Sequence, residues 1–260
     1  MLNATNITVE LGRKRILHGV DFTAGPGEIT AIVGHNGSGK TTLLRAMTGE
    51  IACGGQITLD GDDLRTLPPA ALAARRAVLA QATTLAFPFT VHEVVRLGLT
   101  GQSALLPGAE TLPERALHRV GLEGFGGRFF QELSGGEQQR VQLARVLVQV
   151  WQPVVDDRAR WLFLDEPVAS LDIGHQLQVM RLAAEFANAG GGVVAVMHDL
   201  NLTAMFARSV TLMAGGQVLA AGPVAQVFTS ATLSAAYDCD LRVSTPPPGG
   251  GVFVLPQAVA

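Results

Sequence analysis

The chain has 260 residues, of which 48% are apolar and 16% charged, and this composition excludes an intrinsically disordered protein. Its 19 basic and 22 acidic residues give a net charge of −3, which disfavours a nucleic-acid partner because such binders carry a basic footprint. Cys53 and Cys239 form no metal-ligand pattern and no disulfide framework, so a reducing compartment is expected. No apolar run approaches the roughly 18 residues of a membrane span, and residues 1–14 do not form the pattern of a secretory signal.

Residues 1–60 predict strands around a glycine-rich loop. Apolar and polar residues alternate at 7–11, a second strand is expected at 20–24, and 29–33 is the continuous apolar run of a buried strand. After the loop, the pattern predicts a helix at 41–47 and part of a hairpin at 56–59.

The middle of the chain predicts a helical insertion at about 82–150, with helices expected at 91–97, 114–120 and 137–150. The core then resumes with a strand at 161–164, a helix at 177–187 and a strand at 192–197. Strands that alternate with helices predict an α/β fold with a mixed, largely parallel sheet.

The C-terminal region has a different texture. A run of three prolines and three glycines at 246–251 separates residues 241–244 from residues 252–255, which are predicted to form a small hairpin. We therefore divide the chain into a main domain, residues 1–236, and a C-terminal appendix, residues 237–260.

The glycine-rich loop matches the phosphate-binding pattern G-x-x-x-x-G-K-[ST] and lies between a buried strand and a helix, as that pattern requires. Its glycines let backbone N–H groups turn toward phosphate oxygens, and the N-terminus of the helix favours the same anion. Lys40 is expected to contact the β- and γ-phosphates, and Thr41 to ligate Mg²⁺. The predicted ATP-binding residues are Gly34, His35, Asn36, Gly37, Ser38, Gly39, Lys40, Thr41 and Thr42.

Polar residues also follow two later apolar strands. Asp165 and Glu166 come directly after 161–164, where they suit Mg²⁺ and the activation of the attacking water; a capping pair is the alternative interpretation. His198 follows 192–197 and is predicted to hydrogen-bond the γ-phosphate, with a purely structural histidine as the alternative.

The segment Leu133-Ser134-Gly135-Gly136-Glu137-Gln138 is a serine cap with two glycines that opens a helix. With the phosphate loop, Gln81, Asp165-Glu166, Ser170-Leu171-Asp172 and His198, in order along the chain, it resembles the ATP-binding cassette (ABC) ATPases over residues 2–227. This resemblance implies a P-loop ABC-type ATPase core with an inserted helical subdomain, so that residues 1–236 would be the ABC ATP-binding domain.

The resemblance also implies the roles of the site residues around ATP. The catalytic residues would be Glu166, His198 as the switch histidine and Gln81 of the Q-loop. Mg²⁺ would be held by Thr41, Gln81 and Asp165.

Two further motifs carry expectations about assembly. Ser170, Leu171 and Asp172 would form the D-loop. The signature residues Ser134, Gly135, Gly136 and Glu137 would complete the ATP site of the opposite subunit, so the resemblance implies a homodimer with two equivalent sites.

One position departs from the family pattern. ABC ATPases usually place an aromatic residue near the end of the first strand, where it stacks on adenine. The corresponding position here is Leu11, and no aromatic residue precedes Phe22. An aliphatic contact to adenine is therefore expected.

The segment from Phe87 to Val95 is similar to importers of metal chelates. The link at 150–160, with Trp151 and Pro153, is similar to that of haemin-importer ATPases, whereas an ordinary surface-loop insertion is the alternative. Siderophore or cobalamin import is the alternative hypothesis among importers. The alternative from another functional class is a non-transport ABC ATPase, such as an assembly scaffold or a ribosome-associated factor.

An importer implies partners. We expect two transmembrane permease subunits, a periplasmic substrate-binding protein, and a peripheral position on the cytoplasmic face of the bacterial inner membrane. No direct contact with haem is expected, because the chain has no C-x-x-C-H motif and no pair of histidines spaced as ligands.

Overall fold

The computed structural model describes residues 1–81, 85 and 87–258. The predicted start of the helical insertion at Ala82 and the last two residues of the appendix therefore lie outside the described residues.

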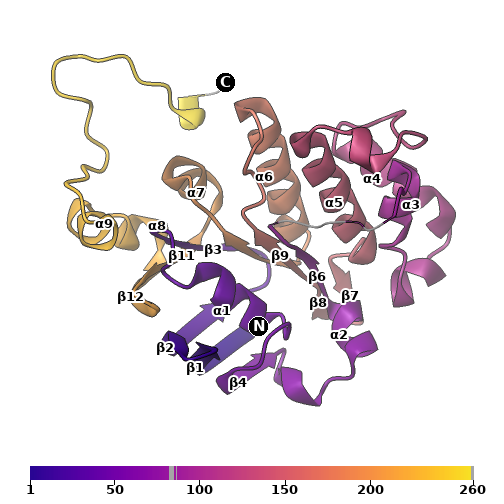
Figure 1. Cartoon of the computed structure of the whole chain (residues 1–260), viewed down its shortest axis with the longest axis horizontal. Coiled ribbons are helices and arrows are strands. Elements are labelled where there is room, and N and C mark those ends of the chain that lie inside the picture. Colours follow the sequence, from indigo (N-terminus) through magenta and orange to yellow (C-terminus); the bar gives the residue numbers. More distant parts are fainter. Residues whose placement is uncertain (82–84, 86, 259–260) are drawn as a thin grey trace.

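Helix α1 (Lys40–Met47) lies between two sheets (Figure 1). The N-terminal sheet is antiparallel and has the strand order β2-β1-β4-β5. It contains the strands predicted at 7–11, 20–24 and 56–59, and its members are β1 (Leu2–Leu11), β2 (Lys14–Ala24), β4 (Gly54–Leu59) and β5 (Asp62–Asp63).

The central sheet has the order β12-β11-β3-β10-β9-β6. All its pairings are parallel except that of β12, which lies antiparallel at one edge. The predicted mixed, largely parallel sheet is confirmed. Its members are β3 (Ile29–Gly34), β6 (Arg76–Leu79), β9 (Trp161–Asp165), β10 (Gly192–Val196), β11 (Ser209–Ala214) and β12 (Gln217–Pro223).

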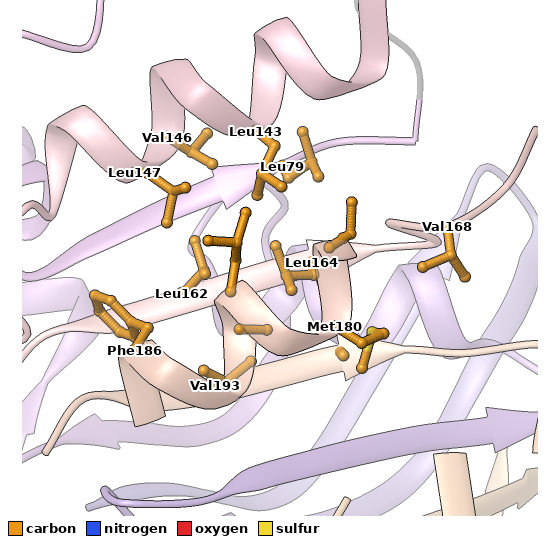
Figure 2. Close-up of a cluster of buried hydrophobic side chains, with 14 of the residues drawn as sticks. Leu79, Leu143, Val146, Leu147, Leu162, Leu164, Val168, Met180, Phe186 and Val193 are labelled. Atoms are coloured by element: carbon orange, nitrogen blue, oxygen red, sulfur yellow. The ribbon is translucent and has the colours of Figure 1, made fainter. Parts of the chain in front are cut away.

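The two faces of the central sheet belong to two apolar cores. Trp161 and Phe163 of β9 point to the face that is covered by α1 and the N-terminal sheet. Leu162 and Leu164 alternate with them and point to the opposite face, toward helices α5 (Gly135–Gln149) and α6 (Ile173–Asn188) (Figure 2). Burial on both faces explains why these strands are continuous apolar runs rather than alternating ones.

The helical insertion projects from one side of the central sheet (Figure 1). Helix α3 begins with a capping box between Thr90 and Glu93, and α5 begins with another between Ser134 and Glu137. Its helices are α3 (Val91–Arg96), α4 (Leu112–Arg119) and α5, with 3₁₀ turns at Gly101–Leu105, Ala109–Thr111 and Phe130–Glu132.

Several elements were not predicted from the sequence. They are a 3₁₀ turn at Leu64–Thr66, α2 (Pro69–Arg75), β6, α7 (Leu200–Phe206), β11, β12, α8 (Val224–Val227), α9 (Ser230–Tyr237) and a 3₁₀ turn at Pro256–Ala258. The long link before β9 forms a small antiparallel ribbon of β7 (Val154–Val155) and β8 (Arg158–Ala159).

The predicted C-terminal hairpin is wrong. Residues 241–244 and 252–255 form no strand. The backbone N–H groups of Leu241 and Val243 instead donate to the hydroxyls of Ser234 and Ser230 on α9, at 2.9 and 3.0 Å. These bonds use the donors that a hairpin would need. The chain then runs outward and returns to α7, where Gln257 donates to the carbonyl of Asn201 (Figure 1).

Gly192 provides a test of this core. It lies opposite Trp161 in the β10–β9 ladder, and a Cβ atom there would approach the indole ring to 2.5 Å. Gly192→Ala should lower the free energy of unfolding by about 1–3 kcal/mol because it overpacks the core. Urea denaturation measures this change. Gly174→Ala is the matched control, since its Cβ would meet only Asp172 at 3.5 Å; equal stability of both variants would contradict the described contact.

Candidate active site

The phosphate loop connects β3 to α1, and its shape depends on glycine. Gly37 and Gly39 have φ angles of 80° and 99°, in the left-handed region. Gly34 lies so close to β11 that a Cβ atom would come within 2.2 Å of the carbonyl oxygen of Met213. No side chain fits at this position. Glycine is therefore required at Gly34 by the close approach of β11.

Two polar side chains of this loop are buried, those of Ser38 and Lys40. The ammonium of Lys40 donates to the carbonyl oxygens of Gly34 and His35, at 2.9 and 3.0 Å. Burial lowers the pKa of Lys40, and the nearby carboxylates of Glu166 and Asp165 act against that shift. Ser38 is fully buried, and its hydroxyl has no hydrogen-bond partner within the described part of the chain. Lys40 lines the cavity over the loop and is therefore available to an anion placed there, whereas Ser38 does not line that cavity.

Oxygen atoms suited to a small hard cation lie beside the loop. The hydroxyl of Thr41 donates to Oδ1 of Asp165 at 3.1 Å. Asp165 is 3% exposed at the end of β9, and burial raises its pKa, while the bond from Thr41 acts in the opposite direction. A cation would remove this desolvation cost. The hydroxyl, the carboxylate and the amide oxygen of Gln81 together fit the oxygen donors that Mg²⁺ prefers.

Side chains that follow three neighbouring strands meet at the carboxylate of Glu166. The amide of Gln81, just beyond β6, donates to its Oε2 at 2.8 Å. Nε2 of His198, just beyond β10, lies 2.5 Å from its Oε1. The predicted catalytic residues are therefore brought together, because the carboxyl ends of adjacent parallel strands share one edge of the sheet.

The backbone of Glu166 is unusual as well. Its φ angle is 52°, in the left-handed region, which costs a non-glycine residue about 1–2 kcal/mol. Its N–H donates to the carbonyl of Val196 on β10 at 3.1 Å. Its carbonyl accepts a bond from the amide of Gln139 at 2.9 Å. The carboxylate is thus positioned through both its side chain and its main chain.

A cavity of about 610 Å³ lies over the phosphate loop. Its walls include most of the predicted loop residues together with the cluster around Glu166. Leu11, the expected adenine contact, does not line it; Lys14 and Ile16 of β2 do, because β1 and β2 form a hairpin that brings β2 to the cavity. The lining residues are Lys14, Ile16, Asn36, Gly37, Gly39, Lys40, Thr41, Thr42, Gln81, Glu166 and His198.

The signature residues lie apart from this cavity. Ser134 caps α5: its hydroxyl accepts from the N–H of Glu137, whose carboxylate accepts from the N–H and hydroxyl of Ser134. These two bonds lower the pKa of Glu137. None of the described residues Ser134, Gly135, Gly136 and Glu137 lines the cavity of the same chain, and Ser134 and Gly135 are exposed.

The predicted D-loop lies between β9 and α6 and packs against α5. Ser170 has a φ angle of 65°. A Cβ atom on Gly136 would lie 3.0 Å from the side chain of Leu171 and 3.3 Å from the carbonyl of Ser170, so helix and loop are in close contact. Asp172 caps α6 by accepting from the N–H of His175 at 2.9 Å; its bonds to His175 lower its pKa.

Three residues at the site were missed from the sequence. Lys14 and Ile16 line the cavity, and Gln139 holds the carbonyl of Glu166. Lys14 and Ile16 carry no local signal, because they reach the cavity only through the pairing of β2 with β1. Gln139 carries no local signal, because its partner is a main-chain atom 27 residues away.

No helix in residues 1–81 or 87–258 is long and apolar enough to cross a membrane. No group of three or more His, Cys, Asp or Glu side chains in the same residues is arranged to hold a metal ion.

The geometry agrees with comparisons of sequence and structure. The hemin import ATP-binding protein HmuV of Jannaschia sp. (strain CCS1) is 65% identical over 258 residues, which covers 99% of this chain and 94% of that protein. The protein of the same name from Roseobacter denitrificans is 60% identical and covers 99% and 98% of the two chains.

Solved structures share the fold. An ATP-binding subunit of an ABC transporter superposes with a TM-score of 0.76 at 23% identity, over 87% of this chain and 91% of the other. A nucleotide-free ATP-binding cassette from an ABC transporter gives a TM-score of 0.72 at 25% identity, over 86% and 91%. Residues 17–169 match the ABC transporter family, and the chain therefore belongs to that family.

Proposed function

We propose that this chain is the ATP-hydrolysing, energy-coupling subunit of an ABC importer of haemin. The haemin substrate is supported by the relatives that match nearly the whole chain and carry the name hemin import ATP-binding protein. The chemistry is supported above all by the convergence of Gln81 and His198 on Glu166 at the edge of the phosphate-loop cavity.

ATP would occupy the cavity with its phosphates in the loop Gly34–Thr42. Lys40 then exchanges the carbonyls of Gly34 and His35 for phosphate oxygens. Thr41, Asp165 and Gln81 would hold Mg²⁺, which when bound neutralises charge on the β- and γ-phosphates. The adenosine would extend toward Lys14 and Ile16.

Glu166 would act as the general base. It takes a proton from the attacking water as the water oxygen bonds to the γ-phosphorus, and the bond from that phosphorus to the bridging oxygen breaks to release ADP. The bonds that the carboxylate accepts from Gln81 and His198 hold it in one orientation. His198 would turn toward the γ-phosphate when ATP is bound.

The exposed signature residues would serve a second copy of the chain. The hydroxyl of Ser134 would exchange the carboxylate of Glu137 for an oxygen of the γ-phosphate, and N–H groups at the N-terminus of α5 would donate to the same anion. Because none of the four described signature residues lines the cavity of its own chain, a head-to-tail homodimer would supply each site with the partner's helix.

The importer would include two permease subunits and a periplasmic substrate-binding protein, with this chain bound peripherally at the inner membrane. Phe87 is a candidate contact for a permease helix, since it is 68% exposed just beyond Gln81. Phe89 meets it edge-to-face with ring centres 6.5 Å apart, but packs against the core. A substitution that tests docking therefore belongs at Phe87 and not at Phe89.

Glu166→Gln tests the catalytic assignment. The amide keeps the shape of the side chain but cannot accept the proton, so ATP hydrolysis should fall by roughly 100-fold or more. ATP binding should persist, and ATP should trap a dimer that size exclusion detects. Glu123→Gln is the control, because that carboxylate is 81% exposed and far from the cavity lining. Hydrolysis near the wild-type rate in Glu166→Gln would remove Glu166 from the proposed role.

Phe87→Asp tests coupling and substrate together. In vesicles that contain the permease and the binding protein, wild-type chain and ATP should drive haemin uptake. Phe87→Asp should abolish uptake while the isolated chain hydrolyses ATP normally, because the change places a charge on the docking surface only. Val252→Asp, at a position 99% exposed in the C-terminal appendix, is the control.

The outcomes of this assay separate the alternatives. Uptake of a siderophore or of cobalamin, but not of haemin, would contradict the proposed substrate but leave the proposed importer function intact. Hydrolysis without uptake of any chelate would favour a non-transport ABC ATPase.

A further inference from the structure

The main chain of Glu166 is tied to two different parts of the molecule. Its N–H donates to Val196, so one side of the residue is fixed to the central sheet. Its carbonyl accepts from the N–H of Ala169 at 3.2 Å and from the amide of Gln139 at 2.9 Å. Gln139 is a residue of α5 and therefore belongs to the helical insertion.

The bond from Gln139 is not a consequence of tight side-chain packing. Gln139 is only half-buried and lines a cavity of about 220 Å³, together with Gln81 and Ser170. Gln142, which is 5% exposed, lines the same cavity with an amide nitrogen that has no partner among the described residues. The amide of Gln139 therefore lies next to open space, and its hydrogen bond to Glu166 contributes to its position.

The conformation of Glu166 makes this bond consequential. A non-glycine residue with a φ angle of 52° persists only where its surroundings hold it. A shift of the carbonyl rotates the residue and moves the carboxylate relative to Gln81 and His198. The position of Gln139 therefore affects the carboxylate that those two side chains contact.

The first turns of α5 carry the cap, the contact with the loop after β9 and the bond to Glu166. Ser134 caps the helix, Gly136 touches the loop at Ser170 and Leu171, and Gln139 reaches Glu166. Further along, Leu143 and Leu147 pack on the central sheet (Figure 2). A displacement of the first turn of α5 is therefore carried to Gln139.

We propose that Gln139 is a positioning residue that ties the backbone of Glu166 to α5. The placement of α5, the helix that begins with the signature residues, then sets the position of the Glu166 carboxylate relative to Gln81 and His198. This inference rests on the proposed role of Glu166 as the general base. Gln139 touches no reacting atom and acts through Glu166 alone.

Two substitutions remove the donor while keeping the length of the side chain. Gln139→Met leaves a non-polar side chain, and Gln139→Glu replaces the donor by an acceptor. Because the two side chains differ in polarity, a site that rejects one of them should accept the other, and at least one variant should fold. Each should lower kcat for ATP by about five- to tenfold, the typical effect of one lost hydrogen bond. KM and Kd for ATP should stay within about twofold, because Gln139 does not line the cavity over the phosphate loop.

Gln149→Met is the matched control. Gln149 lies on the same helix and its amide donates to the carbonyls of Ala73 and Arg76, both at 2.9 Å, remote from the cavity over the phosphate loop. It should lower the unfolding temperature without lowering kcat. An equal fall of kcat in Gln149→Met would show a general structural effect and overturn the inference.

A double mutant separates this inference from the proposed function. If Glu166→Gln lowers the rate of ATP hydrolysis as expected, Gln139→Met added to it should cause no further loss of the residual rate, since Gln139 acts only through Glu166. Wild-type kcat in both folded Gln139 variants overturns the inference and leaves the proposed function intact. Full activity of Glu166→Gln overturns the proposed function itself.

Discussion

The carboxylate of Glu166 is bonded by side chains that follow two other strands, and the remaining features of the site depend on this convergence. Gln81 and His198 lie far from Glu166 in sequence, and they meet it only because β10, β9 and β6 are adjacent and parallel. The same edge of the sheet carries Asp165 and the turn into the phosphate loop. Sheet order therefore determines which side chains can act on one bound anion.

A parallel sheet of this kind requires two buried faces. The alternation of Trp161 and Phe163 with Leu162 and Leu164 supplies both faces from one short strand. Helix α1 fills one face with Leu43 and Leu44, so the helix that follows the phosphate loop is anchored in a core. The loop is thus fixed at both ends, which keeps Lys40 and Thr41 in place before any ligand binds.

The parts of the site that follow long apolar strands could be predicted from the sequence, and so could the phosphate loop; family membership is confirmed by the comparisons. Strand β6 was missed because it has four residues and begins with Arg76, so it shows no clear period. The hairpin predicted at 241–255 was wrong because hydroxyls of α9 take the N–H groups of the first segment. That Leu11 does not line the cavity, and that Gln139 bonds the carbonyl of Glu166, could not be predicted from neighbouring residues, because both depend on how distant parts of the chain fold together.

The central claim is that the carboxylate of residue 166 performs the reaction, and chemical rescue tests it most directly. Glu166→Gly suits the left-handed backbone at this position and leaves space between the donor of Gln81 and the imidazole of His198. The rate of ATP hydrolysis by this variant would be measured against formate concentration at constant ionic strength. The account predicts a very low rate without formate and a saturable recovery with it, whereas chloride has no effect. Hydrolysis at the wild-type rate without formate would contradict the account.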